Sequence, residues 1–79
     1  MSPTVFRHKG YRFFFFSREE ERKHIHVHCS DGEAKFWLEP EIKLANSHGV
    51  SQKQIREMQK QIEENKNAIT DSWDKHFRR

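Results

Sequence analysis

The sequence predicts an α+β fold in which an antiparallel sheet of four to five strands packs against one or two C-terminal α-helices. Up to residue 46, short segments of alternating apolar and polar residues are separated by turn residues, which is typical of antiparallel strands. From residue 51 on, apolar residues recur every three or four positions, which is typical of an amphipathic helix. With 79 residues, we expect a single domain over residues 1–79, with a sheet part at about 3–46 and a helical part at about 51–78.

The first two strands are expected at residues 4–7 and 11–16, joined by a turn that contains Gly10. This turn can hold two or three residues, and the two lengths give different registers. Segment 11–16 carries aromatic residues on both faces, which indicates a strand that is central or covered on both sides. Residues 17–23 form a charged connector, in which Ser17 and Glu20 have the spacing of a capping box for one helical turn.

Residues 24–38 are predicted to form a hairpin. Asp31-Gly32 is a preferred two-residue loop, because both loop positions need a positive φ angle. Directly opposed residues share one side of a sheet, so this loop sorts the hairpin into two faces. The predicted apolar face pairs Cys29 with Ala34, Val27 with Phe36 and Ile25 with Leu38, and the predicted polar face pairs His28 with Lys35, His26 with Trp37 and His24 with Glu39.

Pro40 interrupts the strand pattern, because proline cannot donate a hydrogen bond to a neighbouring strand. A short edge strand is expected at residues 42–45, and a loop at 46–49. Ser51 is the expected N-cap of a helix, since Gln54 stands where a capping box needs it.

The C-terminal part carries an apolar stripe formed by Ile55, Met58 and Ile62. Ile69, Trp73 and Phe77 continue the stripe, but its phase drifts across residues 65–67. We favour two consecutive helices with a bend at this point. One long helix is the alternative, since no residue in 65–67 forbids it.

Composition narrows the classes of function. The net charge is +3, and it is spread along the chain: residues 1–35 hold seven Lys/Arg against five Asp/Glu, and residues 36–79 hold eight against seven. A concentrated basic footprint for nucleic acid is therefore not predicted. The one cysteine, Cys29, excludes an internal disulfide and suits a reducing cytoplasm. No signal peptide and no membrane span are expected.

The polar side of the hairpin is the candidate binding surface. Exposed histidine, lysine and tryptophan on a sheet suit a stacking platform for RNA or DNA, and tryptophan is also enriched where proteins contact one another or form homo-oligomers. Arg22 and Lys23 precede the strand and are placed to hold phosphate. The candidate residues are His24, His26, His28, Lys35, Trp37, Glu39, Arg22 and Lys23.

Two further chemistries are alternatives for the same residues. His24 and His26 alternate on one strand, so their imidazoles can converge on zinc or another transition metal, although two ligands are fewer than zinc sites use. Otherwise no cofactor is expected. A His24–Glu39 pair would orient a general acid–base histidine, as in a histidine-dependent hydrolase or nuclease. No nucleophile motif and no phosphate loop accompany these residues, so whether the protein is an enzyme stays open.

Several motifs resemble the small bacterial proteins grouped as domain of unknown function 4160. They are Pro3-Thr4-Val5, Gly10-Tyr11-Arg12-Phe13-Phe14-Phe15, His24-Ile25-His26-Val27, the run from Asp31 to Pro40, Ile62-Glu63-Glu64-Asn65, and Trp73 with Phe77. Members of that family typically carry Pro-Pro-His-x-His, whereas Arg22-Lys23 stand here where the prolines would be, and His28 has no counterpart.

The resemblance implies a short, cytoplasmic, single-domain protein. Such proteins are often encoded beside another small protein of unknown function, as toxin–antitoxin modules are. We therefore expect a component of a toxin–antitoxin-like pair that binds its small neighbouring-gene protein, and RNA or DNA as a further partner. The alternatives are the metal- or histidine-dependent hydrolase and a purely structural homodimer.

Overall fold

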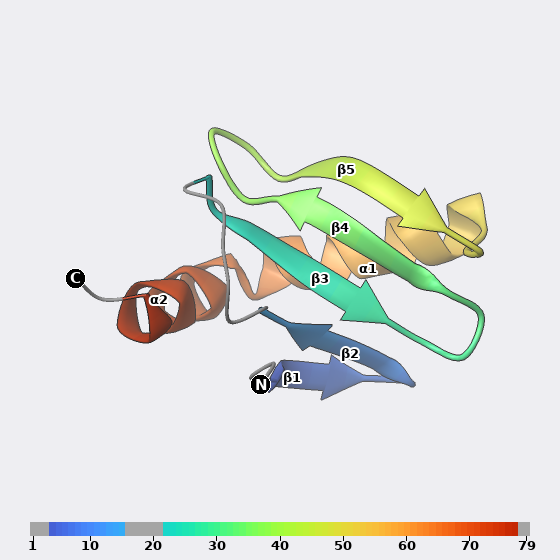
Figure 1. The fold of residues 1–79 in the computed structure, drawn as a ribbon, viewed down its shortest axis with the longest axis horizontal. Coiled ribbons are helices and arrows are strands. Elements are labelled where there is room, and N and C mark those ends of the chain that lie inside the picture. The colour runs from blue at the N-terminus through green and yellow to red at the C-terminus, as the bar shows by residue number, and fades with distance from the viewer. Residues whose placement is uncertain (1–3, 16–21, 78–79) are drawn as a thin grey trace.

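Five strands form one antiparallel sheet, in which each strand lies beside its neighbours in sequence (Figure 1). The computed structural model describes residues 4–15 and 22–77. The predicted α+β fold is confirmed, with five strands and two C-terminal helices. The elements are β1 (Thr4–His8), β2 (Tyr11–Phe14), β3 (His24–His28), β4 (Glu33–Trp37), β5 (Lys43–His48), α1 (Gln52–Glu64) and α2 (Lys66–His76).

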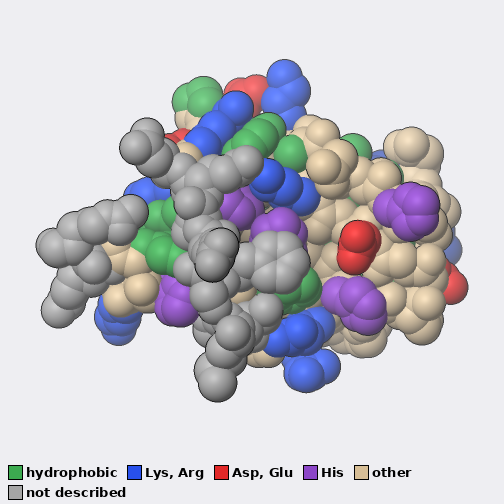
Figure 2. All heavy atoms as spheres, viewed as in Figure 1, with side chains coloured by type: hydrophobic (Ala, Val, Ile, Leu, Met, Phe, Trp, Pro, Cys, Tyr) green, Lys and Arg blue, Asp and Glu red, His purple; other side chains and the backbone are tan. Residues whose placement is uncertain are grey.

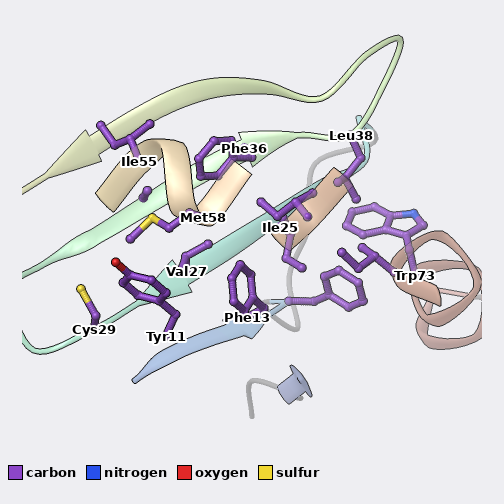
Figure 3. Packing of buried hydrophobic residues seen from close by; sticks show 14 residues of the cluster. Tyr11, Phe13, Ile25, Val27, Cys29, Phe36, Leu38, Ile55, Met58 and Trp73 are labelled. Carbon is purple, nitrogen blue, oxygen red and sulfur yellow. The ribbon is translucent and has the colours of Figure 1, made fainter. Parts of the chain in front are cut away.

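The helices cover one face of the sheet. In Figure 1, α1 passes behind the strands, and Figure 3 shows Ile55 and Met58 pointing from it toward the sheet. Phe13, Val27 and Phe36 face them from three strands and are completely buried. The expected apolar side of the hairpin is therefore the core side, and the opposite side of the sheet points away from α1.

The turn between β1 and β2 holds two residues, Lys9 and Gly10, because His8 pairs with Tyr11. Their φ angles are 48° and 85°, the two positive values that a tight hairpin turn needs. This turn fixes the register of the first hairpin, which the sequence left open. Strand β2 lies between β1 and β3, as its two aromatic faces predicted. Phe16 and the Ser17–Glu20 capping pair lie outside the described residues.

The predicted Asp31-Gly32 loop is wrong by one position. Cys29 and Gly32 exchange two backbone hydrogen bonds, of 2.9 and 3.3 Å, so the loop consists of Ser30 and Asp31. The strand register therefore moves by two residues. His24 pairs with Trp37, His26 with Lys35 and His28 with Glu33, in place of the pairs predicted from the other loop. Because side chains alternate with a period of two, each residue still lies on its predicted face.

The cause of the different loop lies outside the hairpin. A Cβ atom on Gly32 would fall on the carbonyl oxygen of His48, so this glycine is needed where β5 ends against the hairpin. Asp31 accepts a hydrogen bond of 2.8 Å from the side chain of Gln54 on α1. These contacts to later segments outweigh the local preference of Asp-Gly for loop positions.

Strand β5 is longer than predicted and begins one residue later. Residues 46–48 were expected in a loop, yet Asn46 pairs with Lys35 and His48 with Glu33. The register shifts between Lys35 and Phe36, which leaves Ala45 as an extra residue of β5. The bulge separates Leu44, which packs against the core, from the polar residues 46–48, and these polar residues did not predict a strand in the sequence.

The C-terminal segment forms two helices, as favoured from the sequence. Ser51 and Gln54 make the complete capping box at the start of α1, with hydrogen bonds of 3.1 and 2.8 Å. Asn65 ends α1, and its side chain donates a hydrogen bond of 2.8 Å to the carbonyl oxygen of Gln61. A side-chain amide at this point competes with the helical pattern, which explains the break. Among the described residues, 4–15 and 22–77, no helix is long and apolar enough to cross a membrane.

Candidate binding face

The face of the sheet opposite α1 carries polar and aromatic side chains in three rows, here called the polar face. Each row follows strand pairing, so its members stand side by side across the sheet. The first row contains His24, Trp37 and Lys43; the middle row contains Thr4, Phe14, His26, Lys35 and Asn46; the third row contains Arg7, Arg12, His28, Glu33 and His48.

Cations lie directly over aromatic rings on this face. The guanidinium carbon of Arg22 lies 4.1 Å from the centre of the Trp37 ring, and the Lys35 ammonium lies 4.5 Å from it. On β2, the guanidinium of Arg12 lies 4.5 Å from the centre of the Phe14 ring. Such contacts stabilise a cation by roughly 0.5–1 kcal/mol at exposed sites and also fix its position.

The polar face is richer in positive charge than the chain as a whole. Among the described residues of its rows, the cations are Arg7, Arg12, Lys35 and Lys43, and the carboxylate is Glu33. Figure 2 shows blue and purple side chains spread over the sheet on this side of the molecule. The even spread of charge along the sequence therefore does not carry over to the folded surface, because the strands bring separated cations together.

His24 is buried, with 3% of its surface exposed, although the sequence placed it on the binding surface. Its Nδ1 atom lies 2.8 Å from the carbonyl oxygen of Arg22, and its ring meets Trp37 and Trp73 edge to face at 6.0 and 5.2 Å. Trp73 belongs to α2, so a helix residue that follows much later in the chain covers this histidine. His26, His28, Lys35 and Trp37 lie on the polar face as predicted.

Glu39 does not pair with His24, which corrects the predicted acid–base pair. It lies beyond the end of β4, where one carboxylate oxygen is 3.5 Å from the backbone nitrogen of Lys23 and its carbonyl oxygen accepts a 3.0 Å bond from Arg22. The Lys23 ammonium turns to α2 and forms an ion pair with Asp74 at 3.1 Å. Arg22 therefore reaches the polar face, whereas Lys23 ties β3 to the helix.

The rings of His24 and His26 meet edge to face, with centres 5.1 Å apart. Within the described part of the chain, no group of three or more His, Cys, Asp and Glu side chains is placed to hold a metal ion. A zinc site built on these two histidines would thus need a further ligand, and it stays a prediction.

The sequence interpretation missed Arg12, Phe14, Lys43 and Asn46 as members of the face. Arg12 and Phe14 alternate along β2 with the core residues Tyr11, Phe13 and Phe15, although Phe14 is itself only 8% exposed, and this alternation is the signal that could have found them. Asn46 could not be found in this way, because the bulge in β5 breaks the alternation that would have extended the strand.

Tyr11 lies on the other face, under α1, and its hydroxyl donates a 2.7 Å hydrogen bond to Glu57. Burial of the phenol, followed by its hydrogen bond and charge interaction with Glu57, raises the pKa of Tyr11 from 10.0 to about 12. Between pH 10 and 12 the Tyr11 hydroxyl therefore keeps its proton in the folded protein, whereas a tyrosine in the unfolded chain loses it.

Stability is expected to fall as the pH rises from about 10 to about 12. In this window the folded state binds more protons than the unfolded state, so the contribution of Tyr11 is complete below pH 10 and is lost through pH 12. Urea unfolding at a series of pH values measures the change. Since Tyr11 is the one tyrosine of the chain, its tyrosinate absorbance reports the pKa directly. Glu57→Gln should lower that pKa, and an unchanged value would contradict the role of Glu57.

Comparison with known proteins gives the family and nothing further. No curated protein and no solved structure matches the chain. Residues 10–74 match the family described as domain of unknown function (DUF4160). This match spans β2 to the last turn of α2 and so includes the hairpin, the part of the polar face on β2 to β5, and Trp73. The chain belongs to the DUF4160 family.

Proposed function

We propose that this protein is the binding component of a toxin–antitoxin-like two-gene module in the cytoplasm, and that the polar face contacts the small protein encoded beside it. The observation that carries this proposal is the Trp37 ring, half-buried on the face opposite α1 and placed beneath Arg22 and Lys35. Tryptophan and arginine are the side chains that most often dominate the binding energy of protein interfaces.

The charge of the face defines the chemistry of the partner. Lys35, Lys43 and Arg12 would meet a surface rich in Asp and Glu, because complementary charge speeds association and excludes wrong partners. The buried and unpaired Cys29 suits the reducing conditions of a cytoplasm.

Co-expression with the neighbouring gene tests the proposal. The neighbour should co-purify with the wild-type chain and with Lys53→Glu, a charge reversal on exposed α1. Lys35→Glu and Trp37→Ala should each weaken the complex about tenfold or more, as losses at the centre of an interface do. Growth should also change when one gene is expressed without the other. Equal recovery with Lys35→Glu and Lys53→Glu would contradict the assigned surface, and absence of a complex would overturn the proposal.

A further inference from the structure

Two histidines flank a glutamate at the end of the sheet where β4 begins. Glu33, the first residue of β4, pairs with His28 on β3 and with His48 on β5. Directly opposed residues share one side of a sheet, so the three side chains stand in one line on the polar face. On the right of the view, Figure 2 shows an acidic side chain between two histidines. Two imidazoles and a carboxylate thus come together from three strands.

The backbone holds these three positions close together. Cys29 and Gly32 exchange two backbone hydrogen bonds. The next pair outward, His28 with Glu33, is therefore of the type whose side chains approach most closely, with Cα atoms about 4.5 Å apart. A Cβ atom on Gly32 would fall on the carbonyl oxygen of His48, so the end of β5 lies tight against the hairpin. The spacing of the three side chains is thus set by paired strands.

The side chains of this row are free to meet a ligand. All three are exposed, and none makes a hydrogen bond or an ion pair with another residue of 4–15 and 22–77. Two neighbouring cations are directed elsewhere. The guanidinium of Arg12 lies over Phe14, and its Nε donates to Thr4 on the far side of β2. The Lys35 ammonium lies over Trp37.

We propose that His28, Glu33 and His48 together bind one divalent transition metal ion, with zinc as the best fit. Two imidazole nitrogens and one carboxylate oxygen are a ligand set that zinc uses, and they leave a fourth position to water. The carboxylate also offsets one of the two charges of the ion. The site is separate from His24 and His26, and it does not depend on the neighbouring protein.

Rotation of exposed side chains completes the proposed site. Among residues 4–15 and 22–77, no three such side chains already surround a common point. Exposed side chains change rotamer on a picosecond-to-nanosecond timescale, so His28, Glu33 and His48 can turn toward one ion while the strands stay in place. Bound zinc would then join β3, β4 and β5.

Calorimetric titration of zinc chloride into the full chain, prepared without a histidine tag, tests the proposal. One zinc ion should bind per chain. It should also raise the melting temperature, because a ligand that binds the folded state shifts the unfolding equilibrium. In NMR spectra, the ring signals of His28 and His48 should move on addition of zinc, whereas those of His8 should not. Absence of binding at millimolar zinc would overturn the proposal.

Single substitutions identify the ligands. His28→Ala, Glu33→Gln and His48→Ala should each weaken zinc binding about tenfold or more, since loss of a residue that only orients a ligand already costs about ten- to a hundredfold. His8→Ala is the matched control on β1, and it should bind zinc as the wild type does. His26→Ala should also retain binding. Melting without zinc confirms that each variant is folded.

Two results with folded variants would overturn the site. Wild-type zinc affinity in His48→Ala would show that the row does not hold the ion. Loss of binding in His26→Ala, with binding retained in His48→Ala, would assign the metal to the other pair of histidines. Both results are independent of the co-purification experiment, because they use this chain alone.

Discussion

Replacing Gly32 by alanine is expected to lower the free energy of unfolding by about 3 kcal/mol, the upper end of the usual cost of overpacking. The new methyl group would fall on the carbonyl oxygen of His48 and would lie 3.0 Å from backbone atoms of Gly49. Backbone atoms cannot turn aside as a flexible side chain can, so the end of β5 must separate from the hairpin. Denaturant unfolding measures the loss, which corresponds to a decrease in melting temperature of roughly 15 °C.

Gly10→Ala is the matched control for this substitution. Gly10 has a φ angle of 85°, but apart from Gly10 and its two chain neighbours no atom of the described residues lies within 4 Å of the added Cβ. Its replacement should cost about 1 kcal/mol, the strain of one left-handed residue. Gly32 has no positive φ, so its cost is one of space alone. Equal losses for the two variants would show that β5 and the hairpin do not pack as closely as described.

Replacing Trp73 by alanine should cost about 3–5 kcal/mol, as truncation of a buried aromatic side chain does. Ile69 and Trp73 are the buried residues of α2, so this one ring carries much of the attachment of the helix to the sheet. It meets Phe15 at 5.2 Å and His24 at 5.2 Å, both edge to face. Figure 3 shows the Trp73 ring at one end of the core. Urea unfolding followed by circular dichroism measures the cost.

The loss should be concentrated in α2. In hydrogen exchange of Trp73→Ala, the amides of Lys66–His76 are expected to lose protection while those of α1 retain it. Trp73→Phe keeps an aromatic ring and should recover part of the stability. Uniform loss of protection along the chain would show instead that α2 and the sheet unfold as one unit.

The sequence predicted the faces of the hairpin better than its loop. Residues 25–29 and 33–36 alternate between apolar and polar, so every register that buries the apolar side chains sorts them in the same way. A slip of two residues leaves no trace in this pattern. Only contacts to distant segments, at His48 and Gln54, distinguish the two loops. The local preference of Asp-Gly for loop positions therefore predicted correctly that a hairpin forms here, but it predicted the wrong two residues for the loop.

The candidate site was predicted in part for the same reason. His26, His28, Lys35 and Trp37 follow from alternation alone. Burial of His24 depends on Trp73, and the position of Asn46 opposite Lys35 depends on the β5 bulge, neither of which has a local signature. Predicting them would require the packing of α2 and the pairing of β5 to be known first.

The pairings of both outer strands are irregular, between Thr4 and Phe6 in β1 and opposite Ala45 in β5. An extra residue twists an edge strand, so its unpaired backbone N–H and C=O groups are no longer aligned to pair with a strand of another chain. The rims of this sheet are thus poorly suited to growth by addition of strands, and crowded copies of the chain should resist fibril formation. In the proposed function, a partner would therefore meet the broad side of the sheet, where side chains rather than main-chain groups would make the contacts.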